Sequence, residues 1–563
     1  MTAPPAPSPS PPAPPSWWLP GVLAGFVLLG VALYRGALTG PLISDDYGYL
    51  VSHPYLAAVT LEGLLDIWNP WGQARYFAAN FAPVHLSAHL LERLAFGTWT
   101  PGYHLVNVLV HALNASLLLK LLLDAGLARR AALAGGLFFL VHPANVEAVA
   151  WISQLKTSGA LALALGALVA RPRSAWLGLL LFGLALLTKA TAVAALPMAA
   201  AAVWARREAR SAWLPLAGWA LLFGLYCLPQ LSAHDQAGFF AVDAFANPWV
   251  QLRTVAALGA RYLVMAASGI GVGAFQDPPP ALDPLDPWWL ASLPAGGWLL
   301  WRIAVSLRAR SPEAGFWLGA AAGFAPVSQL LPFLYPFADR YLYFILPGLI
   351  GGSAFALRAA ARRVGAGSRA RLAAGALAVG ICALFANASH SRAFLWQGED
   401  RLVEESARLY PDGESARWQK TCAAGRRGDL GEVLARLRAT GDRGASRFES
   451  LFYDACFEPL RSDPAFQSFA REAAGGWLAT AYQVDIQTQA MLRAMAQAHR
   501  LRDERRKARD LYLEAIALGG PLTPRLRKEL RALREEMGEI RGRRREDARR
   551  ERDPAPPAPR GAR

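Results

Sequence analysis

The sequence predicts an all-α membrane protein with about eleven transmembrane helices, a large loop after the first helix and a helical C-terminal domain. Hydrophobic residues make up 54% of the 563 residues and charged residues only 18%, whereas about a quarter of the residues of a soluble domain are charged. Short basic clusters separate the apolar stretches, as in the cytoplasmic loops of membrane proteins. After Ser389 the composition becomes polar with helical periodicity. These observations exclude an ordinary soluble enzyme and an intrinsically disordered chain.

The N-terminal part predicts a tail, one membrane span and a large loop. Residues 1–16 are rich in Pro, Ala and Ser and contain no Lys or Arg, so we expect a disordered tail rather than a secretory signal peptide. Residues 17–38 are apolar and long enough to cross a hydrocarbon core of about 30 Å. Residues 39–102 mix charged and aromatic side chains, which predicts an ordered loop on one membrane face. Amphipathic stretches such as 82–96 are expected to lie at the membrane interface.

Further apolar segments are expected to span the membrane. One stretch, 253–275, is apolar but contains Arg253 and Arg261, and counting it as a span breaks the alternation of basic loops. We therefore interpret it as a re-entrant or interfacial helix. The positive-inside rule then places 39–102 and the C-terminal region outside the cytoplasm. The expected spans after the first are 103–123, 131–150, 154–170, 174–189, 190–205, 212–230, 288–306, 314–335, 338–357 and 371–388.

The C-terminal region predicts a soluble helical domain over 389–552, next to a transmembrane domain over 17–388. Residues 416–440 and 495–518 have the spacing of degenerate helix-turn-helix repeats of the tetratricopeptide kind. A charged helix is expected at 525–551 and a disordered tail at 553–563. 

The four cysteines fit neither a disulfide scaffold nor a metal site. Cys422 and Cys456 lie in the outer soluble region and could pair, a question that the sequence leaves open. Cys227 and Cys382 lie in apolar segments and are expected to be inert.

Two histidine pairs, His85 with His89 and His104 with His111, invite a metal interpretation. They have neither an HExxH pattern nor a nearby third ligand, so packing or hydrogen bonding is the better interpretation. No phosphate-binding glycine motif occurs, which gives nucleotide hydrolysis no support. The net charge of +16 is not gathered into a patch with stacking aromatic residues, so no nucleic-acid partner is expected.

The first candidate site is the adjacent pair Asp45 and Asp46, directly after the first span. Two carboxylates at a membrane boundary cost desolvation and mutual repulsion unless they have a function or stay hydrated. One of them could take a proton from an acceptor hydroxyl while the other orients the acceptor or a metal. The alternative is a hydrated loop that caps a helix.

The second candidate site comprises His142, Glu147 and Lys156, near the outer ends of apolar helices. Ionisable groups in a membrane segment are costly and indicate a site or a pathway. Lys156 could bind a phosphate, and Glu147 a sugar hydroxyl or a cation. The alternative is a structural pair of Glu147 and Lys156 that joins two helices.

The third candidate site is Arg340, preceded by Asp339 and followed by Tyr341 and Tyr343. A guanidinium beside tyrosines suits a phosphate or diphosphate, which it binds through two hydrogen bonds. The alternative is an interfacial aromatic belt with an arginine that reaches the water. Lys189 is a further candidate for the same phosphate, with the same alternative.

Several strings of this sequence together resemble one family. They are Asp45-Asp46, GYHLVNVLVHALN at 102–114, HPANVEAVAWIS at 142–153, Leu187-Thr188-Lys189, and PVSQ at 326–329 leading to DRYLY at 339–343. In this order they resemble the transmembrane and tetratricopeptide-repeat protein O-mannosyltransferases and their bacterial relatives, which are polytopic glycosyltransferases of the GT-C fold. The resemblance covers about residues 17–388, with a weaker similarity in the repeat-like tail.

The resemblance implies transfer of a monosaccharide, with mannose as the family's sugar, from a polyprenyl or dolichyl phosphate with inversion at the anomeric carbon. The implied catalytic carboxylate is Asp45 or Asp46. No cofactor is implied beyond this donor substrate, and the use of a divalent metal is left open. The implied phosphate-binding residues are Arg340, Lys156 and Lys189, and those of the pocket are His142, Glu147, Asp339, Tyr341, Tyr343 and His104.

The sequence departs from the family pattern at three places. Phe81-Ala82-Pro83 stands where the family often has Tyr-Arg-Pro, so Arg75 is a substitute candidate for the phosphate. Lys189 is followed by Ala190 where the family often has Glu, and Lys156 by Thr157 where it often has Asp.

The sequence as a whole predicts a membrane glycosyltransferase in a bacterial inner membrane, with its first loop and C-terminal domain in the periplasm. Its expected partners are the lipid bilayer, the polyprenyl-phosphate sugar, a protein or glycan acceptor and a protein bound by the helical tail. A transporter or flippase of a lipid-linked substrate is one alternative, for which polar residues at mid-membrane and broken helices in paired halves would be expected. A non-catalytic scaffold is the other, although so many spans exceed what an anchor needs.

Overall fold

The protein is all-α, as predicted. The computed structural model describes residues 17–51, 53–57, 60–78, 80–236, 247–331, 335–365, 367–439, 451, 455–482, 489–518 and 522–552. Within these ranges the regular structure consists of helices, and no strand occurs. The expected tails at 1–16 and 553–563 lie outside the described residues.

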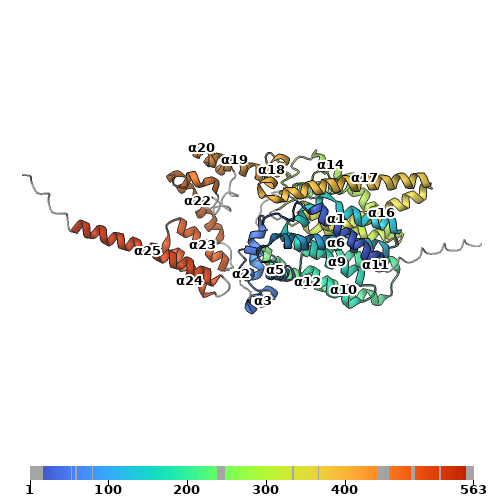
Figure 1. Cartoon of the computed structure of the whole chain (residues 1–563), viewed down its shortest axis with the longest axis horizontal. Helices are drawn as coiled ribbons and strands as arrows, with labels where there is room; N and C mark the ends of the chain where they lie inside the picture. The colour runs from blue at the N-terminus through green and yellow to red at the C-terminus, as the bar shows by residue number, and fades with distance from the viewer. Residues whose placement is uncertain are drawn as a thin grey trace, which may run out of the picture. The chain divides into compact units, whose positions relative to one another are not determined.

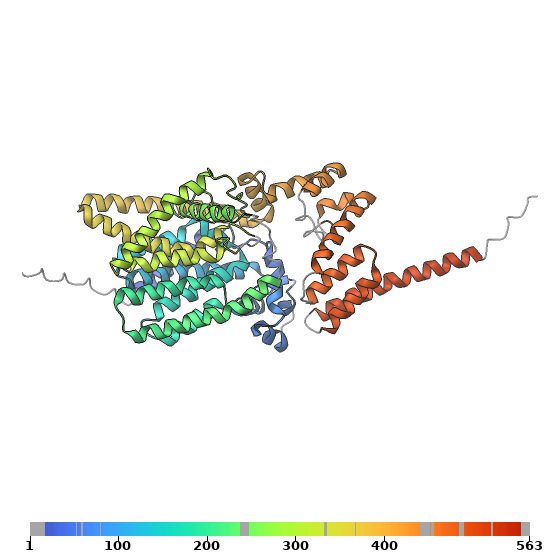
Figure 2. The ribbon, with the colours of Figure 1, turned by 180° about the vertical axis from the view of Figure 1, so that it is seen from behind.

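The chain divides into two compact units. The first comprises Met1–Leu56 and Asn80–Ser415, and the second comprises Ala57–Ala79 and Ala416–Arg563. The helices of the first unit run alongside one another as a bundle (Figure 1), which Figure 2 shows from behind. Although the composition changes at Ser389, the chain remains part of the first unit as far as Ser415.

The apolar helices make this an integral, multi-pass membrane protein. Among the described residues, six helices are long and apolar enough to cross a membrane, or seven when one bent pair is counted as a span. The count of eleven spans is therefore not confirmed. The six are Thr100–Asp124, Ile152–Ala170, Arg210–Ala233, Pro287–Arg308, Asp339–Val364 and Ser368–Gln397.

Three of the expected spans are apolar but short. They are Trp18–Tyr34, Ala175–Leu186 and Ala190–Arg206, and a straight crossing needs about 20 residues at 1.5 Å per residue. The expected span 131–150 is a bent pair, in which α7 (Arg129–Val141) meets Pro143–Ala150 at 50°. Proline ends the first helix because its ring clashes with the preceding turn.

One expected span differs from its prediction, whereas the stretch expected as a re-entrant or interfacial helix is helical. That stretch contains the continuous helix α13 (Pro248–Ser268), which the Asn247 side chain caps and Gly269 ends at φ +66°. Helix α13 is not among the described helices that are apolar enough to cross a membrane, and its position at the interface stays a prediction. The segment 314–335 is not one long helix, because α15 (Glu313–Phe324) stops after 12 residues. A 3-10 turn that contains Pro326 follows, and proline has no N–H with which to continue the helical ladder.

Helices α15 and α16 (Asp339–Val364) pack closely because α16 presents glycines to its neighbour. A Cβ at Gly351 or Gly352 would overlap the Phe316 or Trp317 side chain of α15. Small residues permit such close approach of helices in membranes. The packing fixes the middle of α16 against α15, and the first turn of α16 carries Arg340.

The first loop continues into short helices within the same unit. A π-helical turn at Tyr47–Val51 follows the carboxylate pair, and α2 (Pro54–Ala57) comes next. The amphipathic helix expected at 82–96 is present as α5 (Pro83–Phe96). Its exposed side carries Leu91 and Leu94, whose contact with a membrane interface remains a prediction.

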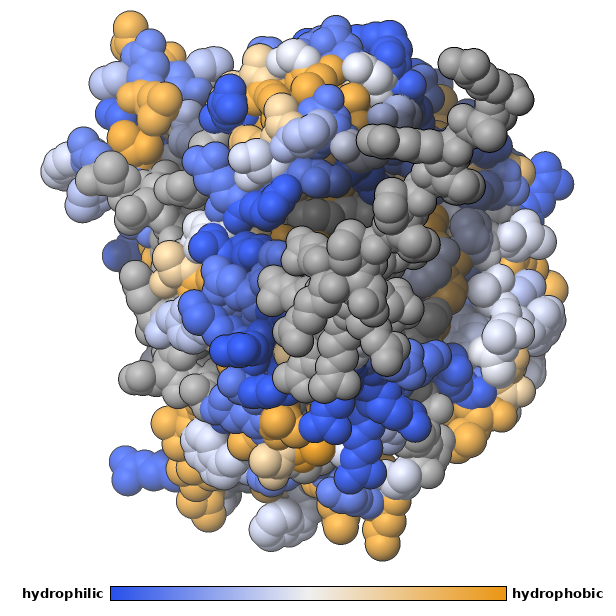
Figure 3. Space-filling model, turned by 90° about the vertical axis from the view of Figure 1, so that its left-hand side faces the viewer, coloured by the Kyte–Doolittle hydropathy of each residue, from blue (hydrophilic) through white to orange (hydrophobic). Residues whose placement is uncertain are grey.

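The second unit is helical and largely polar. Helices α19 (Glu414–Arg426) and α20 (Leu430–Ala439) form one helix-turn-helix, and α23 (Gln489–Leu501) and α24 (Arg505–Ala517) form another, at the predicted positions. Hydrophilic residues cover much of the face drawn in Figure 3, where hydrophobic residues gather only in separate groups. The unit also contains α3 (Leu61–Trp68), α4 (Ala74–Phe77), α22 (Pro464–Ala481) and α25 (Thr523–Arg552), the predicted charged helix.

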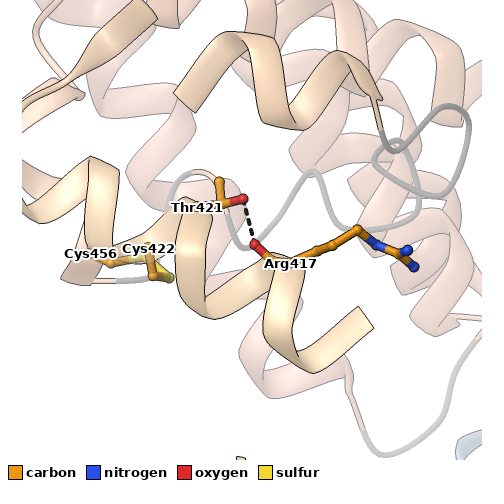
Figure 4. Close-up of a disulfide and its surroundings, with 4 residues drawn as sticks. All are labelled: Arg417, Thr421, Cys422 and Cys456. Carbon is orange, nitrogen blue, oxygen red and sulfur yellow. Dashed lines mark hydrogen bonds between the residues drawn. A yellow bond between two sulfur atoms is a disulfide. The ribbon is translucent and has the colours of Figure 1, made fainter. Parts of the chain in front are cut away.

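Cys422 and Cys456 form a disulfide in this second unit, so the pairing that the sequence leaves open is present in the structure. The bond joins α19 to the 3-10 turn at Ala455–Leu460 (Figure 4). Thr421, next to Cys422, donates a hydrogen bond of 2.8 Å from its hydroxyl to the Arg417 carbonyl within the same helix. Cys227 and Cys382 are unpaired.

Candidate functional site

The two adjacent aspartates have different environments. Asp46 is 1% exposed, and its carboxylate accepts hydrogen bonds from the backbone N–H groups of Ile43 at 3.0 Å and Ser153 at 2.8 Å. The Trp151 indole also donates to the Ile43 carbonyl at 3.1 Å. Burial raises the pKa of Asp46 to about 7. Asp46 therefore fastens the first loop to the turn at 151–154.

The Asp45 side chain is only partly buried, and among the described residues it makes no hydrogen bond or ion pair. It interacts electrostatically with both Lys156 and Arg340. Of the two adjacent carboxylates, Asp45 is thus the one that can act on a bound molecule.

Arg340 is held by a carboxylate from a distant part of the chain. Its backbone N–H donates to Glu147 Oε2 at 2.8 Å, and its guanidinium donates to Glu147 Oε1. The guanidinium carbon also lies 5.3 Å, 5.5 Å and 5.0 Å from the ring centroids of Trp151, Tyr335 and Tyr341. The partner of Glu147 is therefore Arg340, and the alternative pair of Glu147 with Lys156 is not formed.

The two candidate lysines lie near this arginine. Lys156, in the first turn of α9 (Leu155–Ala170), places its Nζ 3.4 Å from the Tyr49 hydroxyl and 5.1 Å from the centroid of that ring. Lys189 lies between α10 (Ala175–Leu186) and a 3-10 turn at Ala190–Ala194, and it donates to the Thr157 hydroxyl at 2.7 Å. Its Nζ is 6.0 Å from the centroid of the Tyr341 ring.

The three cations share one region of the first unit. Lys189 interacts electrostatically with Lys156, Arg340 and Glu147. Burial, followed by the charges of Lys156 and Arg340, holds the pKa of Lys189 well below its ordinary value. Gathering like charges is unfavourable unless an anion binds among them, and guanidinium and ammonium groups are the usual protein donors to phosphate. The geometry therefore suits a phosphate beside the Asp45 carboxylate.

Two of the predicted pocket histidines have structural partners instead. His142 donates from Nε2 to the Ala266 carbonyl at 3.1 Å, and its Nδ1 accepts from the Ala144 N–H at 3.2 Å, so both ring nitrogens are occupied by backbone. His104 lies 3.3 Å from the Gly40 carbonyl and supports the first loop.

Two of the predicted pocket residues in 339–343 make their hydrogen bonds with groups other than Arg340, Lys156 and Lys189. Tyr343 is fully buried and contacts His111 and Asn114 between helices. Asp339 accepts hydrogen bonds from the Gly273 N–H at 2.9 Å and from the Gln276 side chain. In contrast, the Tyr341 ring lies beside both Arg340 and Lys189, as described above.

Arg75 belongs to the second compact unit. Its guanidinium donates to the Pro70 carbonyl at 2.8 Å and lies 5.0 Å from the ring centroid of Trp71. Both contacts are within its own segment, and a role for Arg75 at the phosphate remains a prediction.

The structure adds residues that the sequence does not single out. Tyr49 follows the carboxylate pair in a π-helical turn, a rare geometry that occurs frequently at functional sites. The Thr157 hydroxyl accepts a hydrogen bond from Lys189. Trp151 and Tyr335 flank Arg340. In the sequence, aromatic residues stand close to Arg340 and to the Asp45-Asp46 pair, and this could have indicated that they belong to the site. The contacts themselves join segments that are far apart in the chain, so the sequence does not show them.

His85 and His89 lie beside Tyr49, with ring centroids 5.1 Å and 5.8 Å from the tyrosine ring. His89 Nδ1 is 2.6 Å from Glu92 Oε2. Within the described part of the chain, no group of three or more His, Cys, Asp or Glu could hold a metal ion. The use of a divalent metal remains open.

Comparison with known proteins shows a partial similarity to an O-mannosyl-transferase. Over 131 residues the chain is 33% identical to Protein O-mannosyl-transferase Tmtc1 of Drosophila melanogaster. This similarity supports the resemblance that the sequence strings carry. The match covers 23% of this chain and 15% of that relative, so most of the length of Tmtc1 is unmatched.

No protein-family model matches the chain. Among solved structures, the apo oligosaccharyltransferase of Archaeoglobus fulgidus matches with a TM-score of 0.38 and 14% identity. The match covers 73% of this chain and 58% of the archaeal chain. This TM-score is too low to establish a shared fold.

Proposed function

We propose that this protein is a membrane glycosyltransferase that moves a sugar from a polyprenyl-phosphate donor to an acceptor hydroxyl outside the cytoplasm. The observation that carries the proposal is the gathering of three cations, Arg340, Lys156 and Lys189, of which Arg340 and Lys156 also interact with the partly exposed Asp45 carboxylate. The similarity to an O-mannosyl-transferase makes mannose the first sugar to test and protein O-mannosylation the first reaction.

The charge balance favours a monophosphate donor. Three cations, Arg340, Lys156 and Lys189, face two carboxylates, Asp45 and Glu147. One added negative charge neutralises this set, and a sugar-phosphate-polyprenol diester carries one. A diphosphate-linked donor carries more negative charge than the set balances.

The chemistry follows from this arrangement as a single displacement. Asp45 takes the proton of the acceptor hydroxyl while the hydroxyl oxygen forms a bond to the anomeric carbon. The bond between that carbon and the phosphate oxygen breaks, its electron pair leaves with the phosphate, and the configuration inverts. Arg340, Lys156 and Lys189 stabilise the charge that develops on the leaving phosphate.

The Cys422–Cys456 disulfide supports an outer location for the C-terminal region. Disulfides persist in oxidising compartments such as the bacterial periplasm and are rare in the cytosol. The distribution of basic clusters favours the same orientation. We therefore infer that the protein lies in a bacterial inner membrane and uses a protein or glycan acceptor in the periplasm, with the helical tail available to bind it.

The test is transfer of label from polyprenyl-phosphate [³H]mannose to acceptors in membranes that contain the full-length protein. Asp45→Asn is expected to lower the transfer rate about 10²- to 10⁴-fold, because a general base contributes that much. Asp510→Asn, an exposed aspartate of α24, is the matched control and should retain the parent rate.

Two results would contradict the proposal. Transfer by Asp45→Asn at the parent rate would exclude this carboxylate as the base. Movement of the labelled donor across the membrane without incorporation into any acceptor would instead favour a transporter or flippase.

A further inference from the structure

A polar network joins the start of α16 to the chain that follows the apolar region. The Asp339 carboxylate, directly before Arg340, accepts from the Gly273 N–H at 2.9 Å and from the Gln276 side chain. Arg392, at the end of α17 (Ser368–Ala393), lies 3.8 Å from the same carboxylate. Asp339 is thus occupied by the loop after α13 and by α17.

Helix α18 (Glu399–Leu409) completes this network. Its Glu405 accepts two hydrogen bonds from Arg392, at 2.7 Å and 3.2 Å, and one from the Ala274 N–H at 3.1 Å. Glu405, Arg392 and Asp339 therefore form a continuous line of charged groups that ends next to Arg340.

The loop at 273–277 is also fixed directly by α18 and the residues after it. The Ser406 hydroxyl donates to the Phe275 carbonyl at 2.7 Å, and the Tyr410 hydroxyl donates to the Gln276 side-chain oxygen at 2.7 Å. A Cβ at Gly273 would overlap the Leu409 side chain, so the loop approaches α18 as closely as glycine permits. Leu402 is fully buried in the main apolar core.

These contacts give the start of α16 two supports. One is Glu147, which binds both the backbone N–H and the guanidinium of Arg340. The other is the network through Asp339 to Arg392 and Glu405. Glu147 holds Arg340, and the network of Arg392 and Glu405 holds the preceding residue, Asp339. Because these two residues are consecutive, a shift of α18 changes the position of the Arg340 guanidinium.

We infer that α18, through Glu405 and Arg392, is a positioning element for the phosphate-binding Arg340, although its sequence belongs to the polar C-terminal region. The inference rests on the proposed function, which assigns Arg340 to the donor phosphate. If the network only attached the C-terminal region, its mutation would change stability or the binding of the acceptor. If it positions Arg340, its mutation changes the binding of the donor.

The test compares full-length variants in detergent with Glu405→Gln as the main change. The Gln side chain keeps the shape but removes the charge that holds Arg392. We expect about tenfold weaker binding of polyprenyl phosphate and a similar rise in the donor KM, with the acceptor KM unchanged, since coupling through such a network changes affinity by about 2- to 30-fold. Glu404→Gln, the exposed neighbour on α18, is the matched control and should bind as the parent does.

Two further variants keep the test decisive if Glu405→Gln is poorly folded. Tyr410→Phe removes only the bond to Gln276 and should weaken polyprenyl-phosphate binding by a smaller factor. Arg392→Lys keeps the charge and should bind more tightly than Arg392→Gln. Folded Glu405→Gln or Tyr410→Phe with the parent Kd and donor KM would overturn the inference alone. A parent protein that binds no polyprenyl phosphate would overturn the proposed function, and this inference with it.

Discussion

Two buried polar regions of the membrane bundle differ in how their groups are satisfied. In the first, Tyr343 donates to His111 Nδ1 at 2.8 Å, and the opposite ring nitrogen of His111 donates to the Leu140 carbonyl at 3.0 Å. Asn114 donates to the Tyr343 oxygen at 3.1 Å and to the Ser158 carbonyl at 2.8 Å. All of these groups are uncharged, and each of these hydrogen bonds is made between protein atoms.

The second region, around Arg340, Lys156 and Lys189, has more positive charge than its own carboxylates balance. Neutral networks of the first kind join helices, because transmembrane helices gain little from the hydrophobic effect when they associate. Surplus charge of the second kind is costly without a ligand. Burial of polar groups alone therefore does not indicate a functional site, whereas buried charge without a balancing partner does.

The largest effect is expected when the cationic region loses its arginine. Arg340→Gln should lower kcat/KM for transfer about 10²- to 10³-fold, as loss of one preorganised charge donor does. It also leaves the Glu147 carboxylate buried without its partner, which costs about 3–5 kcal/mol of stability. Rates and melting curves of the purified protein measure both effects.

The double variant Arg340→Gln/Glu147→Gln separates these two effects. It removes the unpaired charge, so stability should largely return while transfer stays low. Recovery of transfer in the double variant would show that Arg340 serves only the fold.

The pH dependence of donor binding should distinguish the cationic region from the neutral one. Burial and the charges of Lys156 and Arg340 hold the pKa of Lys189 well below its ordinary value, and a bound phosphate raises it again, so Lys189 keeps its proton to higher pH in the complex than in the free protein. Affinity for polyprenyl phosphate should therefore fall as pH rises, by up to about tenfold per pH unit for one proton. Binding measured across pH in the parent and in Lys189→Met checks this, and an unchanged slope in the variant would contradict the assignment.

Asp46 is a buried carboxylate whose hydrogen bonds come from the protein's own backbone, and its ionisation can be tested. Its pKa is about 7 when folded, against about 3.9 in an unfolded chain. The folded state therefore holds this proton more tightly, and the resulting stability is fully present below about pH 4 and lost as pH rises through 7. Asp46→Asn should flatten this dependence of the melting temperature. It should also cost about 1–3 kcal/mol, because the amide NH₂ cannot accept a backbone N–H.

The smallest effect is expected in the neutral network. Tyr343→Phe removes one hydroxyl that joins His111 and Asn114, which should lower the free energy of unfolding by about 1 kcal/mol. Donor KM should not change. A selective rise in donor KM would mean that the neutral region also contributes to the site.

Much of the fold follows from local sequence. The apolar runs predict the positions of six long helices, because a long hydrophobic helix satisfies its own backbone in lipid. They are α6 (Thr100–Asp124), α9, α12 (Trp213–Gln236), α14 (Pro287–Arg308), α16 and α17. The count of spans does not follow. Helix α15 ends early, and the bent pair that begins with α7 is broken at Pro143. The average hydrophobicity of a segment does not reveal such breaks.

The candidate site was predictable in its residue types but not in its pairs. Arg340, Lys156 and Lys189 stand out as charges beside apolar helices. Asp45 and Asp46 cannot be told apart in the sequence, because their difference arises from Ser153, 107 residues away from Asp46. His142 and Tyr343 looked like pocket residues because their strings are distinctive, but backbone and interhelical partners take up their polar atoms.

The sequence by itself determined an all-helical membrane protein, since hydrophobic length and periodicity are local properties of the chain. It also determined which charges border the apolar segments. Only the tertiary structure decided that Glu147 binds Arg340 across 193 residues and that residues 389–415 belong with the membrane unit. The physical reason is that a charge pair or a docked helix depends on packing between distant segments, which composition and spacing do not encode.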